Sequence, residues 1–124
     1  MAAIQVGQMV TVAAMHKENR PGVVLQVTPV GYIVVVAGST KDLDPDRHEV
    51  RKGSLAAKEM GLSETTFFSA DGVLGIEADR VQPRKQICPM RVLLKLEQRF
   101  RVRGERLLLR HGIFWKQIEQ QSAS

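Results

Sequence analysis

Residues 21–40 read PGVVLQVTPVGYIVVVAGST and carry no charged side chain over twenty positions. A run of this length is long enough to raise the question of a membrane-spanning helix. A proline and a glycine interrupt it at 28–31 (TPVG), where they suit a type I turn. β-branched residues dominate on both sides, at 23–27 and 32–37. The stretch therefore predicts a hairpin of two strands buried on both faces, and not a membrane span.

Strand signals continue on both sides of this hairpin. Apolar residues around 6–12 alternate roughly with polar ones, which is typical of a first strand. Further on, residues 65–69 and 73–76 flank Asp71-Gly72, a dipeptide that favours a second hairpin. A sheet with so few strands hides its edges most easily by closing on itself. The first 80 residues therefore predict a small β-barrel.

One short helix is expected within this β-rich region. Residues 55–60 have helical composition, Ser54 is a suitable N-cap, and Gly61 follows as the C′ residue. Between the predicted strands, residues 38–47 (GSTKDLDPDR) hold the turn formers of a loop.

The last third of the chain has a different pattern. Pro83 and Pro89 favour an extended segment, and the apolar spacing from Val92 to Phe100 then predicts a helix to about Val102, ended by Gly104. The alternative is a strand, because Phe100 and Val102 also alternate with arginines before a possible turn at 104–105. The helix is favoured. The expected fold class is mainly β with short helices, a small barrel core over residues 1–80 and a basic, helical extension over residues 81–124.

Composition narrows the function classes. A chain of 124 residues is long enough for one domain with a core and too short for two ordinary ones. A single cysteine, Cys88, excludes an internal disulfide, and three scattered histidines lack metal-ligand spacing, so neither metal nor cofactor is expected. The first ten residues have no basic region before an apolar one, as a signal peptide would. We therefore expect a cytoplasmic protein.

Charge is distributed unevenly along the chain. Residues 1–79 hold 7 Lys/Arg and 10 Asp/Glu, whereas residues 80–124 hold 11 Lys/Arg and 3 Asp/Glu, which together give the formal net charge of +5. Such asymmetry suggests nucleic acid or an acidic protein as partner. The alternative is a basic surface that serves solubility alone.

Several short motifs occur together in a recognisable order. They are GQMVTV at 7–12, RPGVV at 20–24, VVVAGST at 34–40, EV at 49–50 and GLSETTF at 61–67. In this order and spacing they resemble the PemK/MazF family of toxin endoribonucleases, over about residues 4–80. The resemblance implies a small Src-homology-like β-barrel, a homodimer, cleavage of single-stranded RNA without a metal, and inhibition by an antitoxin protein of a type II toxin-antitoxin system.

The residue types fit such chemistry. Without a metal, the ribose 2′-OH attacks its own phosphodiester, so the protein must move protons and stabilise the developing negative charge. Arg20 matches the arginine of the family's RP motif, and its planar guanidinium can hold two phosphate oxygens. The family then has Thr-Ser after its third strand. This chain has Ser39-Thr40, so Ser39 is the aligned hydroxyl with Thr40 beside it.

The remaining candidates extend this site. His16 is a candidate general base, because imidazole titrates near neutral pH. The residues predicted to contact RNA are all basic, and they are Lys17, Arg20, Lys41, Arg84 and Lys85. Aromatic residues for base stacking are sparse.

Two features depart from the family pattern. The loop before Arg20, which carries RNA-binding groups in the family, is reduced to residues 14–19, and Asp42, Asp44 and Asp46 would repel a phosphate nearby. The alternative function is therefore a non-catalytic RNA- or protein-binding module on the same small barrel, comparable to KOW-type domains. A third possibility is a structural or regulatory protein whose apolar tail completes a homo-oligomer.

Overall fold

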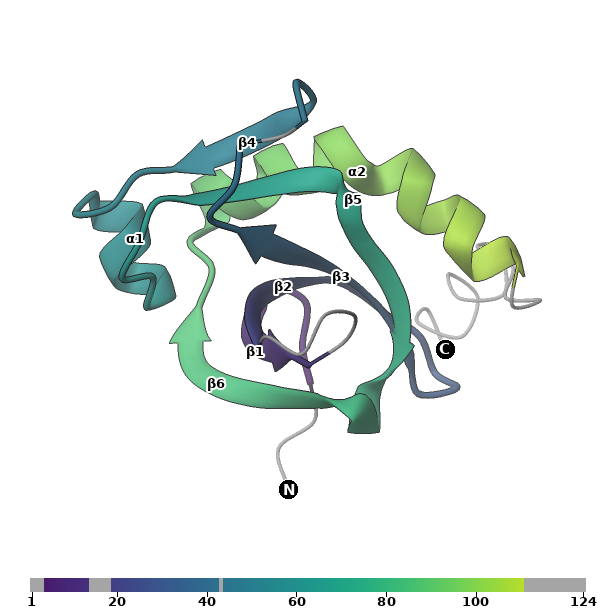
Figure 1. Ribbon diagram of the computed structural model, residues 1–124. Helices are drawn as coiled ribbons and strands as arrows, with labels where there is room; N and C mark the ends of the chain where they lie inside the picture. The colour runs from purple at the N-terminus through teal and green to yellow at the C-terminus, as the bar shows by residue number, and fades with distance from the viewer. Residues whose placement is uncertain (1–3, 14–18, 43, 111–124) are drawn as a thin grey trace.

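The computed structural model describes residues 4–13, 19–42 and 44–110. They form one antiparallel sheet and two α-helices, and Figure 1 shows the sheet strongly curved, with β5 and β6 bending around β1 to β3. The elements are β1 (Gln8–Val12), β2 (Arg20–Val27), β3 (Tyr32–Ser39), β4 (Arg47–Val50), α1 (Leu55–Met60), β5 (Thr66–Glu77), a 3₁₀ turn (Ala78–Arg80), β6 (Val81–Ile87) and α2 (Met90–Arg110).

The sheet has the strand order β4-β5-β3-β2-β1-β6. The fold is therefore mainly β with two helices, one of them C-terminal, as expected from the sequence. Its end strands, β4 and β6, do not pair with each other in the described part of the chain, so the expected closure into a barrel is not seen there. β6 pairs with β1, and the sheet consequently continues past residue 80, where the sequence placed the end of the core.

The charge-free stretch forms the predicted β2–β3 hairpin. Gly31 has a φ of +81°, which glycine adopts without strain, and its N–H donates to the Thr28 carbonyl at 3.2 Å. The Thr28 hydroxyl donates to the Tyr32 carbonyl at 2.7 Å and locks the same turn. No helix in the described ranges is long and apolar enough to cross a bilayer.

Both faces of the sheet are covered, which explains the continuous apolar run in β3. Val34 and Val36 belong to the larger core, which also contains Leu96 and Phe100 of α2. Ile33 and Val35, on the alternate positions, belong to a second core with β1 and β2 residues on the opposite face. Burial on both faces was predicted from the sequence and is confirmed.

The expected hairpin at Asp71-Gly72 is wrong. Residues 66–77 form one strand, β5, and both its halves pair with β3, since Phe68 lies opposite Gly38 and Val73 opposite Val36. Four residues, 69–72, thus lie opposite the single residue Ala37. The chain bends here without reversing, because both halves find their hydrogen-bond partners on the same neighbouring strand.

α1 has the predicted boundaries. The Ser54 side chain accepts a hydrogen bond from the Ala57 N–H at 3.1 Å, as an N-cap does. Gly61 ends the helix with a φ of +71°, and its N–H bonds to the Lys58 carbonyl at 3.2 Å.

α2 is helical, as favoured, but it continues beyond the predicted end. Gly104 lies inside the helix and faces the sheet, where an added Cβ would meet Val34 Cγ1 at 3.2 Å. Its role is close packing of helix on strand, so glycine there is not a terminator. The strand alternative for this region is wrong, because residues 90–110 are helical and Val92, Leu93, Leu96, Phe100 and Leu108 lie on one buried face of the helix.

Candidate functional site

The register of the β2–β3 hairpin brings the RP arginine and the third-strand serine together. Gly22 pairs with Ala37 in these antiparallel strands. Two residues back along β2 lies Arg20, and two residues forward along β3 lies Ser39, so both stand at the same end of the sheet. The motifs at 20–24 and 34–40 therefore converge on one place.

A pocket of about 250 Å³ opens at this end of the sheet. Its described lining holds the two cations Arg20 and Lys41 and no carboxylate. The remaining lining residues are polar or small, and they are Asn19, Pro21, Gly38, Ser39, Thr40 and Thr66. We call this the Arg20 pocket.

A second pocket of about 220 Å³ shares Arg20, Ser39 and Lys41 with the first. We call it the β4 pocket, because Arg47 of β4 lines it. Asp44 and Asp71 bring negative charge, and the other lining residues are Ala37, Phe67, Ser69 and Gly72. Arg20, Ser39 and Lys41 thus lie between two hollows, one lined by cations and the other by both signs of charge.

Ser39 is held in a fixed orientation. Its Oγ accepts a hydrogen bond from the Lys41 N–H at 3.1 Å, which closes a short turn after β3. A hydroxyl that accepts from the backbone still has its own hydrogen to donate. Ser39 is also half-buried and lines both pockets, whereas Thr40 is exposed and lines only the first. Of the two hydroxyls, Ser39 is the better positioned donor to an anion.

Arg20 is half-buried, and its side chain has no carboxylate or hydrogen-bond partner among the residues that the structure describes. Arg47, in contrast, forms an ion pair with Asp42 and lies 5.8 Å from the centre of the Phe67 ring. A guanidinium without an internal partner keeps its donors available for a ligand. Arg20 is therefore the arginine of this site that is best prepared to bind an anion.

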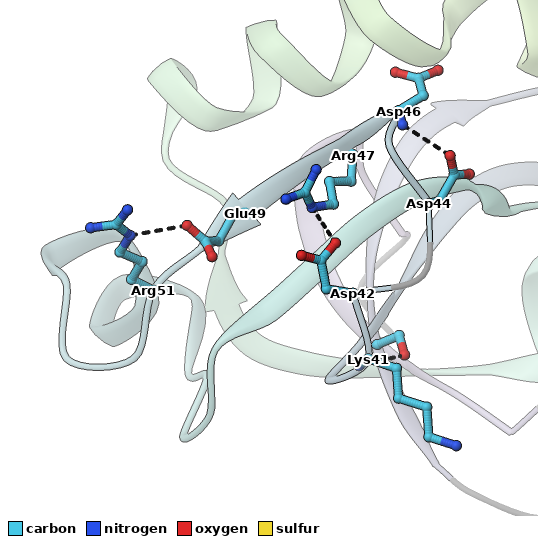
Figure 2. A network of polar contacts seen from close by, with 8 residues as sticks. Lys41, Asp42, Asp44, Asp46, Arg47, Glu49 and Arg51 are labelled. Carbon is cyan, nitrogen blue, oxygen red and sulfur yellow. Dashed lines mark hydrogen bonds and ion pairs between the residues drawn. The ribbon is translucent and has the colours of Figure 1, made fainter.

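The acidic loop is occupied by internal contacts, as Figure 2 shows. Asp42 pairs with Arg47, and Asp44 Oδ1 accepts from the Asp46 N–H at 2.9 Å. Asp46 in turn contacts Arg99 Nη1 of α2 at 2.8 Å. Two of the three carboxylates are thus neutralised by arginines, and the repulsion of a phosphate expected from the sequence is reduced accordingly.

Arg84 and Lys85 do not line either pocket. Arg84 Nε donates to Thr11 Oγ1 at 2.7 Å. Arg20 pairs with Val12, and neighbouring residues of a strand point to opposite faces, so Thr11 and Arg84 belong to the other face of the sheet. His16 and Lys17 lie outside the described residues, and their predicted roles stay predictions.

Sequence reasoning missed Asn19, Thr66 and Arg47. Thr66 could have been found, because it belongs to the GLSETTF motif and β5 pairs with the end of β3. Arg47 had no comparable signal, since its position depends on how the loop at 40–46 folds back.

The groups with shifted pKa values lie outside the two pockets. Burial raises the pKa of Cys88 to about 12, so this thiol stays protonated and is a poor nucleophile. Burial, Lys95 and Arg99 lower the pKa of His48 in β4. No group of three histidine, cysteine or carboxylate side chains within the described ranges could hold a metal ion.

The sequence matches no protein-family model and no curated protein.

Proposed function

We propose that this protein is a metal-independent endoribonuclease similar to the PemK/MazF toxins, cleaving single-stranded RNA by attack of the ribose 2′-OH. The observation that carries the proposal is the meeting of Arg20, Ser39, Thr40 and Lys41 around one pocket. Arg20, Ser39 and Thr40 belong to two of the motifs that resemble the family, and Lys41 directly follows the second of them. The curved sheet is compatible with the Src-homology-like barrel of that family.

The roles follow from the chemistry of the groups. The Arg20 guanidinium binds the scissile phosphate and stabilises the charge of the phosphorane. The Ser39 hydroxyl donates to a phosphate oxygen, and Lys41, which is exposed and also lines the pocket, contacts the adjacent phosphate. A base must remove the 2′-OH proton, and the departing 5′-oxygen must receive a proton as its bond to phosphorus breaks; His16 is the candidate for the base. Within the proposal the protein is cytoplasmic, forms a homodimer and is inhibited by an antitoxin protein.

The test is cleavage of a long single-stranded RNA in excess EDTA, with the fragment ends mapped. Wild type should produce 2′,3′-cyclic phosphate ends, and Arg20→Ala should lose about 10²- to 10³-fold in rate, as does removal of one preorganised charge-stabilising group. Arg80→Ala is the matched control, because Arg80 is an exposed arginine in the 3₁₀ turn and lines neither pocket. It should cleave like wild type, and loss of cleavage in Arg20→Ala purified in the same way then excludes a contaminating nuclease.

The same cleavage assay distinguishes the contribution of the Ser39 hydroxyl from that of the Thr40 hydroxyl. We expect Ser39→Ala to slow cleavage more than Thr40→Ala, because Ser39 lines both pockets and is oriented by its turn. Equal cleavage by wild type and Arg20→Ala would contradict the proposal. An absence of cleavage at high protein concentration, with RNA binding retained, would favour the binding module instead.

A further inference from the structure

α2 carries a large part of the positive charge of the protein. Its 21 residues include seven lysines and arginines and two glutamates, a net charge of +5 that equals the formal net charge of the whole chain. A helix needs only one apolar face to pack on a sheet, so this excess of charge is not required by the fold.

Part of this charge is used within the molecule. Arg91 pairs with Glu59 at 3.6 Å, Arg99 with Asp46 at 2.8 Å, and Arg101 with Glu105 at 3.0 Å. The cations of α2 without a carboxylate partner among the described residues are Lys95, Arg103, Arg106 and Arg110.

These four cations and Arg99 lie on one flank of the helix. Arg99 forms an ion pair with Asp46, which directly precedes β4, and the charges of Lys95 and Arg99 lower the pKa of His48 within β4. The part of this flank that holds Lys95 and Arg99 therefore faces that strand. Residues three or four apart share one side of a helix, which extends the row from Lys95 to Arg110. We call these five residues the basic flank. At about 1.5 Å per residue the row is roughly 22 Å long.

The basic flank begins next to the proposed cleavage site. Asp46, which holds Arg99, immediately precedes Arg47, and Arg47 lines the β4 pocket together with Arg20. Figure 1 shows α2 running beside β4 and then onward past β5. A chain leaving the pocket over β4 therefore meets the basic flank directly.

We propose that the basic flank binds the backbone of single-stranded RNA that extends from the Arg20 site. This inference rests on the proposed function and adds a second, sequence-independent contact region to it. A row of cations, four of which have no carboxylate partner among the described residues, attracts a polyanion of matching length, and counterions are released on binding. The only exposed large apolar residues within α2 are Met90, Leu94, Val102 and Leu109, and none is aromatic, so backbone contact is expected in preference to base stacking.

The test compares the affinities of a strand of about 20 nucleotides and one of about four, a length that fits the pocket alone. Both carry 2′-deoxy sugars, which removes the nucleophile and leaves binding only. Arg103→Gln/Arg106→Gln should lower the ratio of long-strand to short-strand affinity several-fold. It should also flatten the slope of log affinity against log salt by about 1.4 for the long strand, since each phosphate contact to a single strand contributes about 0.7.

Two further variants sharpen the test. Lys58→Gln/Arg80→Gln removes the same charge from exposed positions in α1 and the 3₁₀ turn, and it should keep the wild-type ratio. Asp46→Asn frees Arg99 and removes a negative charge between the pocket and the basic flank, so it should raise the ratio.

The two proposals can fail separately. If Arg20→Ala cleaves single-stranded RNA as fast as wild type does, the proposed function fails. If Arg20→Ala weakens short-strand binding but Arg103→Gln/Arg106→Gln leaves the ratio unchanged, the RNA role of the basic flank is overturned. A loss of binding to anionic lipid vesicles in that double variant, with the ratio unchanged, would assign the flank to a membrane surface and overturn it equally.

Discussion

Gly72 shows how one residue shapes the candidate site. It lies in the four-residue bend of β5 opposite Ala37, and a Cβ at this position would collide with the Ala37 carbonyl oxygen. The close approach brings Ser69 and Asp71 to the β4 pocket. The glycine is required because backbone meets backbone here, not because of an unusual φ angle.

We expect Gly72→Ala to lower the free energy of unfolding by about 1–3 kcal/mol, because the new methyl group must displace a paired strand. Urea denaturation measures this loss. Gly75→Ala is the control within the same strand, since its Cβ would meet only the movable ring of Tyr32. An equal loss in the two variants would show that the contact with Ala37 is not what matters.

Among the elements, α2 has the largest effect on the fold, since one buried face of it covers the sheet. Leu96 is 0% exposed in the larger core, whereas Leu94, two residues earlier, is 49% exposed. The two leucines therefore separate the contribution of packing from that of helix propensity.

Leu96→Ala should cost about 2–5 kcal/mol of unfolding free energy, because it leaves a cavity between α2 and the sheet. Leu94→Ala removes the same atoms from an exposed position and should change stability by about 0.5 kcal/mol or less. Thermal or urea unfolding of the two variants checks this. Similar losses would mean that α2 does not pack as described.

The contact of β4 with α2 also predicts a pH dependence. Burial, Lys95 and Arg99 lower the pKa of His48 from its ordinary 6.5. His48 therefore binds a proton more readily in the unfolded chain than in the folded protein. As the pH falls below about 6.5, protonation of the unfolded chain lowers the free energy of unfolding. His48→Gln should lose less stability than wild type between pH 7 and about pH 5. Urea titrations at both pH values measure the difference, and an equal loss in both proteins would contradict it.

At the scale of the whole molecule, stability should decrease from the centre of the sheet to its ends. β3 is paired on both sides, by β2 and β5, and packs on both faces, whereas β4 pairs only with β5. Segments with few buried contacts open at lower free energy than the core does.

We therefore expect the amides of Ile33, Val35 and Val36 to exchange with solvent deuterium most slowly. The amides of Arg47–Val50 should exchange faster, because β4 pairs only with β5 and contributes a single residue, Val50, to the larger core. Native-state hydrogen exchange followed by NMR tests this order. Equal protection of β3 and β4 would indicate a single cooperative unit.

Features that a few neighbouring residues encode can be predicted from the amino-acid sequence alone. The turn at 28–31, the caps of α1 and the apolar run of β3 follow from local conformational preference and from burial on two faces, and the structure confirms them. Arg20 and Ser39 could also be identified as candidate site residues from the sequence, because the register of a tight hairpin places them at the same end of the sheet.

Features that depend on partners distant in the chain follow only from the folded structure. Asp71-Gly72 favours a hairpin locally, yet both halves of β5 pair with β3, and the energy of a full strand ladder outweighs the preference of a dipeptide. Gly104 would end an isolated helix, but here it lets α2 approach Val34. The pairing of the acidic loop with Arg47 and Arg99 likewise depends on residues brought together only by the folded chain.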